Sequence, residues 1–382
     1  MSKKQKVYDV NVKTSIGGQA LIEGIMMRGP KRTAMAVRNT SGEIVIEEWK
    51  TEFSAKKKVL KMPVIRGVFA FFDSMKIGYK CLMRSAEISG LEEIEEDLKR
   101  EKAAKKAAKQ GIVLQNISDE KLVDIKNTET EIQSDTENIV ENKSQSTIDD
   151  KSEKETKKSG TLTTLIMIIG IVFGVVLAIG LFKFVPELLY QYGFLKLFPS
   201  LDNAGYGYSF ARALFTGIVK ISLLVGYMLL ISLMKDIRRT FMFHGAEHKT
   251  IFCYEHGLPL TVENIKIQRR FHPRCGTSFL ILMMIVGIFI TMFIPQQLVS
   301  SPIYNTILRT FISLLLLPLM MGLGYELIKV AGKHDNIATR IISAPGMWLQ
   351  HITTKEPDND MIECAIAAVI RVIPDDGSDI LK

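Results

Sequence analysis

Hydrophobic residues along this chain gather in long runs, and highly charged segments separate the runs. Four of the runs approach the roughly 20 apolar residues that a helix needs to cross a bilayer. They occupy residues 161–185, 211–234, 277–294 and 303–330. The third is only just long enough, and the fourth contains Arg309, Pro318 and Glu326. The pattern predicts a mainly α-helical, polytopic membrane protein with about four transmembrane helices.

The N-terminal residues 1–62 follow a different pattern. A glycine-punctuated stretch, GGQALIEGIMMRGP, precedes two apolar segments, TAMAVRN and EIVIEEW, which flank TSG. Glycines at such places mark turns or close approaches of the backbone, and two short apolar segments around a turn are typical of a β-hairpin. We therefore expect a small β-rich unit at the N-terminus, on the cytoplasmic side of the membrane.

Three further segments complete the organisation. In residues 63–110 charged residues interrupt the apolar ones, which favours amphipathic and charged helices that lie on the membrane or pack against the other helices. Residues 111–159 are polar, with few aromatic residues, and cannot bury enough apolar surface to fold alone. This stretch is expected to be a disordered linker, whereas residues 331–382 are expected to form a C-terminal cytoplasmic segment.

The distribution of charge predicts the orientation. The formal net charge is +8, but the basic residues cluster beside apolar runs, which is typical of membrane proteins rather than of nucleic-acid binding. The segment 235–276, between the second and third runs, is rich in Lys and Arg, whereas the other two loops hold almost none. No apolar core follows the first residues, so no signal peptide is expected. Both termini and the segment 235–276 should therefore face the cytoplasm.

The segment FHGAEHKTIFCYEHG, residues 243–257, carries the candidate chemistry. His244, Glu247 and His248 spell HxxEH, and on a helix the two histidines lie one turn apart on the same face. Imidazole is a preferred zinc ligand, and in zinc hydrolases such a glutamate activates a water molecule. The pattern predicts a helix that binds a divalent metal, zinc by preference, with Glu247 as the candidate general base.

Further ligands are expected from the ends of the third and fourth runs. His272 and Cys275 lie three apart in HPRCGTS, and Glu326 lies near the cytoplasmic end of the fourth run. The predicted topology brings all of these to one membrane boundary, where ionisable residues are functional candidates. Three histidines and the cysteine would make a closed structural site, whereas two histidines, a carboxylate and water would leave it open for chemistry. Polar packing of the histidines without a metal is the alternative.

Several motifs together resemble a known family. GGQALIEGIMMRGP, FHGAEHKTI, LTVEN, HPRCGTSFL, GYELIK and WLQHITTKEP occur in the order of the signatures of the YqhQ-like bacterial membrane proteins. That family is a domain of unknown function whose members are carried as predicted metal-dependent enzymes. The resemblance covers nearly all of the chain except residues 92–159. It implies a bacterial inner-membrane location, and it places the six candidate residues in the family's motifs.

Two classes of function remain open on the sequence. The first is a membrane enzyme, a metal-dependent hydrolase, that acts at the cytoplasmic interface on a membrane protein, a lipid or a small molecule. The second is a non-catalytic adaptor or regulator, in which a metal, if bound, only holds the segment 235–276 in place. A transporter is less favoured, because polar groups do not gather at mid-membrane. The lipid bilayer is the one partner that the sequence predicts, and it leaves the oligomeric state open.

Overall fold

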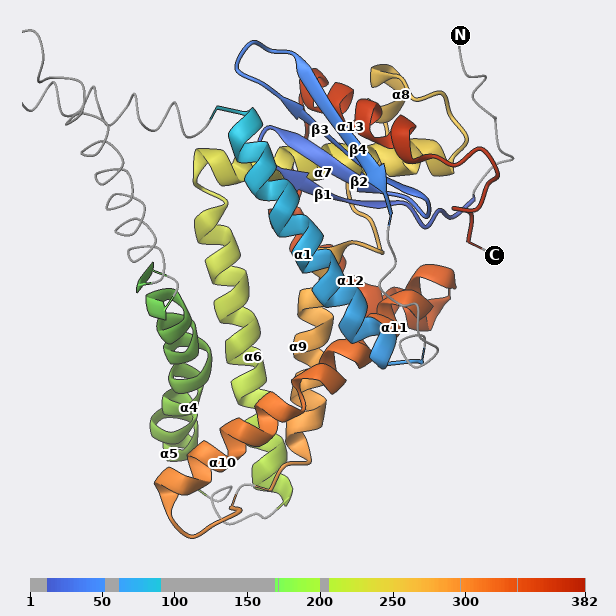
Figure 1. The fold of residues 1–382 in the computed structure, drawn as a ribbon. Helices are drawn as coiled ribbons and strands as arrows, with labels where there is room; N and C mark the ends of the chain where they lie inside the picture. Colours follow the sequence, from blue (N-terminus) through green and yellow to red (C-terminus); the bar gives the residue numbers. More distant parts are fainter. Residues whose placement is uncertain are drawn as a thin grey trace, which may run out of the picture. The chain divides into compact units, whose positions relative to one another are not determined.

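The computed structural model describes residues 12–51, 62–90, 169–170, 172–199, 206–295, 297–334 and 336–381. The chain divides into two units, Met1–Glu93 with Leu188–Lys382, and Ile94–Glu187. The sheet, which Figure 1 draws as blue arrows, belongs to the first unit, and so do the residues of the candidate site. The expected charged helix after residue 91 and the expected linker 111–159 lie outside the described residues.

The N-terminal β-rich unit is confirmed as a four-stranded antiparallel sheet. Its strands, in the order β1-β2-β3-β4, are β1 (Gly17–Leu21), β2 (Gly24–Arg28), β3 (Arg32–Arg38) and β4 (Ile44–Lys50). The predicted hairpin is the pair β3–β4. Its turn contains Gly42 at φ +84°, a conformation that favours glycine because a side chain would be strained there.

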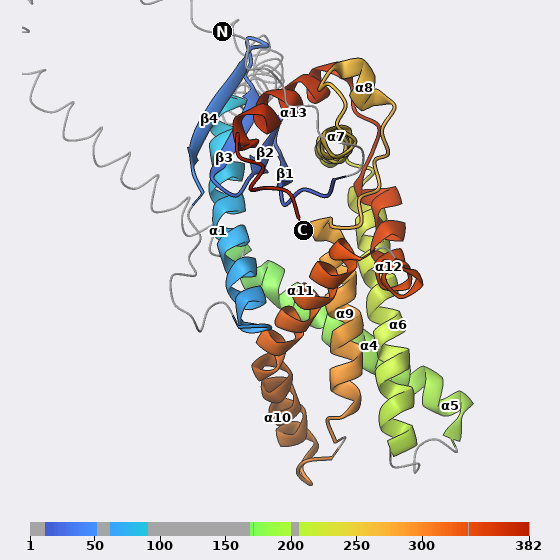
Figure 2. The same cartoon turned by 90° about the vertical axis from the view of Figure 1, so that its right-hand side faces the viewer.

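Helices cover both faces of this sheet. Since side chains alternate along a strand, Ile25 and Met27 point to one face and Met26 to the other. The first face packs on α7 (Lys235–Glu255) and α13 (Asn359–Val372), and the second packs on α1 (Ile65–Ile88) (Figure 2). The segment predicted as amphipathic is thus a helix packed on the sheet and on α11 (Leu317–Lys333).

The prediction of a mainly helical membrane protein is confirmed. Among the described residues, three helices are long and apolar enough to cross a membrane: Val172–Leu197, Gly207–Ile231 within α6 (Tyr206–Ile231), and Ile307–Gly332. The last runs from within α10 (Pro302–Leu315) into α11, with a break at Leu316, two residues before Pro318. The helix Val172–Leu197 includes η2 (Gly180–Phe184), α4 (Val185–Leu188), η3 (Leu189–Phe194) and α5 (Leu195–Leu197). Part of the first expected span, 161–185, lies outside the described residues.

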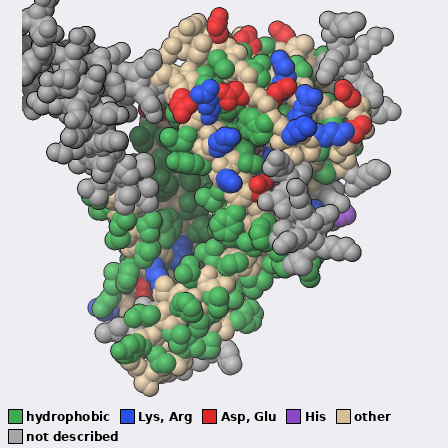
Figure 3. All heavy atoms as spheres, viewed as in Figure 1, with side chains coloured by type: hydrophobic (Ala, Val, Ile, Leu, Met, Phe, Trp, Pro, Cys, Tyr) green, Lys and Arg blue, Asp and Glu red, His purple; other side chains and the backbone are tan. Residues whose placement is uncertain are grey.

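The expected third span is a shorter apolar helix, α9 (Gly276–Met292). It begins only at Gly276 because Cys275 is still extended, and it ends at Met292, three residues before Pro295. The local backbone conformation therefore determines where this helix begins and ends, whereas its apolar composition predicted only that it exists. On the face drawn in Figure 3, hydrophobic side chains cover the apolar helices, and most charged side chains gather over the sheet.

The histidine-rich segment lies on a helix of its own, α7, which is separate from α6. Residues 232–234 form a turn between α6 and α7, where Met234 is extended. The second half of α7 is buried all round rather than along one stripe, since every residue from Gly245 to Ile251 is buried. The sheet, α13 and the short helix α8 (Val262–Lys266) enclose it.

Candidate metal centre

Three side chains with metal-ligand atoms meet beside α7. His244 and His248 are one turn apart, and their ring centroids are separated by 4.4 Å. Cys275, the N-cap residue of α9, brings its sulfur to the same place. One ligand atom from each residue lies within 4.8 Å of the other two. The structure therefore brings together three of the five residues that the sequence proposed as ligands.

Backbone carbonyls fix the orientation of both imidazoles. His244 Nδ1 lies 2.8 Å from the carbonyl oxygen of Thr353, and His248 Nδ1 lies 2.5 Å from that of Arg270. A carbonyl only accepts, so each Nδ1 must carry a proton, and in the neutral form of each ring the lone pair is on Nε2. His248 Nε2 is fully buried and has no hydrogen-bond partner in the described part of the chain. Metal-binding histidines are typically held in this way, by a carbonyl on the nitrogen that does not bind the metal.

Cys275 has the electrostatics of a thiolate. Burial alone would raise the pKa of its thiol, but the neighbouring His244 and His248 outweigh burial and hold that pKa well below its usual value. Its sulfur is 3.1 Å from His244 Nε2. Burial lowers the pKa of His244 and the thiolate raises it, with a net rise to about 9. In the absence of a metal, the two groups therefore form a buried thiolate–imidazolium pair.

Glu247 lies beside this group without belonging to it. Its side chain is buried, and burial raises the pKa of the carboxyl although His244 and His248 oppose the rise. The backbone N–H of Gly18 on β1 donates to it. A Cβ on Gly18 would come within 3.0 Å of Glu247 Cδ and 2.7 Å of the Met26 carbonyl oxygen. Glycine at this position thus allows β1 to approach the carboxylate closely.

Two adjacent glycines test this contact. Gly18→Ala is expected to destabilise the fold by about 1–3 kcal/mol, the usual cost of overpacking, because backbone and carboxylate would have to shift. Gly17→Ala is the matched control, since a Cβ there meets nothing within 4 Å. Thermal unfolding of the purified protein in detergent measures both. Equal thermal unfolding midpoints for the two variants would show that β1 does not pack closely against Glu247.

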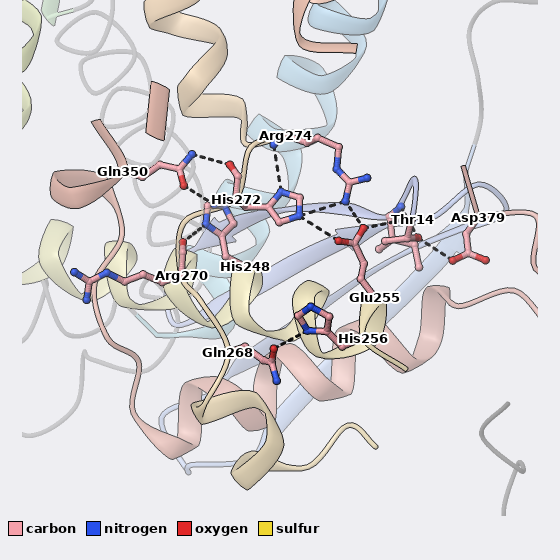
Figure 4. Close-up of polar contacts among 11 residues, drawn as sticks. Thr14, His248, Glu255, His256, Gln268, Arg270, His272, Arg274, Gln350 and Asp379 are labelled. Carbon is pink, nitrogen blue, oxygen red and sulfur yellow. Dashed lines mark hydrogen bonds and ion pairs between the residues drawn. The ribbon is translucent and has the colours of Figure 1, made fainter. Parts of the chain in front are cut away.

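His272, the fourth predicted ligand, faces a separate buried network. Its Nδ1 lies 3.3 Å from the backbone N–H of Arg274, and its Nε2 lies 3.7 Å from Glu255 Oε2 (Figure 4). Arg274 and the Thr14 backbone N–H also donate to Glu255. Burial, more than any other effect, lowers the pKa of His272 to about 4, so the ring is neutral at pH 7. Both ring nitrogens have protein partners, unlike the free Nε2 of His248.

Gln350, a residue without a role in the sequence analysis, fixes the segment that carries Cys275. Its side chain accepts from the His272 backbone N–H at 2.7 Å and donates to the His272 carbonyl oxygen at 2.8 Å (Figure 4). It also lies 3.0 Å from Ser278 Oγ. Gln350 and Thr353 both belong to α12 (Ile337–Thr353), so this helix positions both the histidine and the cysteine side of the group.

Glu326, the last predicted ligand, is paired elsewhere. Arg66 of α1 donates to Glu326 through Nε at 2.6 Å and also through Nη2, and the Val64 backbone N–H adds a longer contact. The pair joins α1 to α11, where Gly322 and Gly67 allow close packing. The structure does not bring Glu326 into the group formed by the two histidines and Cys275.

The chain belongs to the family described as a protein of unknown function (DUF1385), whose family model matches residues 62–375. It is 29% identical over 358 residues to the uncharacterised protein YqhQ of Bacillus subtilis (strain 168), and the aligned region covers 93% of this chain and 91% of that protein. No solved structure matches the chain. The family resemblance read from the motifs is thereby confirmed, and the matched region includes the whole histidine–cysteine group.

Proposed function

We propose that this protein is a membrane-bound metal-dependent hydrolase. It would hold one divalent ion, zinc by ligand preference, through the Nε2 atoms of His244 and His248 and the sulfur of Cys275. Imidazole and thiolate together suit zinc. The observation that carries the proposal is His248 Nε2, a buried acceptor without a partner among the described residues that lies beside two other ligand atoms. A lone pair buried in this way is costly unless something binds it.

The number of ligands favours an open site. Structural zinc sites are usually closed by four protein ligands, whereas catalytic ones have three and keep a position for water. A zinc ion bound here would act as a Lewis acid and make such a water more acidic. Glu247 is next to the three ligands, is buried, and has a raised pKa, so its carboxylate is suited to accept the proton from that water.

The proposal includes a location and a class of substrate. The excess of Lys and Arg between the second and third apolar runs supports cytoplasmic termini and a cytoplasmic site. The similarity to a Bacillus subtilis protein supports the bacterial inner (cytoplasmic) membrane as the location. The substrate would be a membrane protein, a lipid or a small molecule that reaches the site at the interface. No nucleic-acid partner is proposed.

Cobalt substitution tests the ligand set. The wild-type protein, loaded with Co²⁺, should give a thiolate-to-cobalt charge-transfer band in the near ultraviolet and the strong visible bands of tetrahedral coordination. Cys275→Ser should lose the charge-transfer band. Serine is a good N-cap residue, so α9 should be unaffected and the loss would report on ligation alone. A charge-transfer band that survives in Cys275→Ser would remove the cysteine from the proposed site.

A second candidate function arises from the same three residues. The sulfur of Cys275, 3.1 Å from His244 Nε2 and of low pKa, is also suited to act as a nucleophile with His244 as its acid–base partner. The two candidates differ in their response to metal. Zinc should protect Cys275 from iodoacetamide if the site binds metal, whereas a nucleophilic cysteine should be alkylated at the same rate with and without zinc.

A further inference from the structure

The helix α12 exposes large apolar side chains and buries polar ones, the opposite of what a helix on the surface of a soluble protein does. Ile337, Ile341 and Trp348 are spaced by four and seven residues, so at about 100° per residue they share one face. They are 77%, 67% and 70% exposed, respectively. A soluble helix would bury such residues and expose its polar ones. In α12 four polar side chains are buried instead: Thr339, Ser343, Gln350 and Thr353.

The buried face of α12 holds the candidate metal centre. Gln350 bonds to the backbone of His272, and the Thr353 carbonyl oxygen accepts from His244. Gly346 lies so close to Ser278, near the start of α9, that a Cβ on it would collide with the serine side chain. The inner face of α12 is therefore occupied by protein, and only its outer face is available to another partner.

The position of α12 in the chain indicates what that partner is. The helix begins at Ile337, within five residues of the end of the apolar helix Ile307–Gly332. A segment so close to the end of a membrane span must stay near the membrane surface. Tryptophan and isoleucine on an exposed face suit the interfacial region, where the tryptophan ring has both apolar and hydrogen-bonding surroundings.

We propose that α12 lies in the bilayer–water interface, with Ile337, Ile341 and Trp348 inserted into lipid. The helix then lies between the membrane and the histidine–cysteine group. Its outer face contacts lipid, and its inner face makes the hydrogen bonds that position the group. This assignment concerns the outer face of α12 and stands whether or not the group binds a metal.

The chain contains only two tryptophans, which makes the test direct. Trp49→Phe leaves Trp348 as the single tryptophan, and excitation at the red edge of the tryptophan band avoids the ten tyrosines. This protein should be reconstituted into phosphatidylcholine vesicles with and without bromine atoms on the acyl chains. Bromine quenches only fluorophores that contact lipid, so a large loss of Trp348 emission is expected in the brominated vesicles, greater for bromines near the headgroup than for bromines near the chain ends.

The reciprocal variant, Trp348→Phe, is the matched control. It retains Trp49 of β4, which packs against the buried cluster between the sheet and α1, and its emission should be the same in both kinds of vesicle. The triple variant Trp49→Phe/Trp348→Phe/Ile341→Trp repeats the test at a second position on the same face. Equal emission of Trp348 in the two kinds of vesicle would overturn the proposal, because the face would then be covered by water or by protein. Quenching of Trp49 as strong as that of Trp348 would also overturn it.

Discussion

Replacing His248 by alanine should greatly weaken zinc binding, because it removes one of the three proposed ligands. Loss of an outer partner of a ligand typically costs about 10–100-fold in metal affinity, and loss of a ligand should cost more than this. The remaining His244 and Cys275 would leave two ligands, too few for a stable site. Zinc titration of the purified protein against a chromophoric chelator measures the change.

His256→Ala is the matched control for this prediction. His256 caps the same helix, but it is exposed and bonded to Gln268, away from the group. The variant should bind zinc as the wild type does. Because alanine at a buried position can also destabilise α7, His248→Asn supplies a polar replacement. If His248→Ala and His256→Ala bind zinc equally well, His248 is not a ligand.

Replacing Glu247 by glutamine should slow catalysis by about 10²–10⁴-fold while zinc stays bound. Glutamine has nearly the same shape and still accepts the Gly18 N–H, but it does not accept a proton. General-base catalysis is typically worth about 10²–10⁴-fold in rate, so a loss of this size is expected. Zinc-loaded wild type and variant should be compared with p-nitrophenyl acetate and with bis-p-nitrophenyl phosphate as probes.

The Glu247→Gln variant also distinguishes between the two proposed classes of function, an enzyme and a non-catalytic adaptor. In an adaptor the metal would only hold α7 and the segment that carries Cys275 together, and Glu247→Gln would change neither binding nor any rate. Zinc content and thermal midpoint serve as controls in both cases, and both should match the wild type. A wild type that cleaves neither probe faster than its Glu247→Gln variant contradicts the base role of Glu247.

Local patterns predicted much of the secondary structure. The apolar segments around TSG predicted the hairpin β3–β4, because its turn chemistry is local. Local patterns did not predict how the helices pack on the two faces of the sheet. Strands β2 and β3 are buried on both faces, and which helix covers which face depends on contacts between residues more than 200 positions apart, such as those of α7 and α13 with the sheet.

The candidate site was predictable only in part. The four-residue spacing of His244 and His248 fixes their relation on any helix, whereas the three-residue spacing of His272 and Cys275 does not. HPRC is not helical, so His272 turns to Glu255 while Cys275 turns to the histidines. The partners that orient the imidazoles are backbone carbonyls, which leave no signal in the sequence.

The pairing of Glu326 was equally hidden from sequence reasoning. Its partner Arg66 lies 260 positions earlier in the chain, at the start of α1. No local pattern connects two residues at that separation, because only the packing of α1 on α11 brings them together. From the sequence alone, a carboxylate near the end of an apolar run was a reasonable candidate ligand, but the structure pairs it with Arg66.

The metal content of the purified protein tests the central claim most directly. Wild type and the His244→Ala/His248→Ala double variant should be purified in detergent and measured by elemental mass spectrometry. The account predicts close to one zinc ion per chain in the wild type and none in the double variant, with the fold retained in both. Absence of metal from the wild type, even after incubation with zinc, manganese or iron, would contradict it.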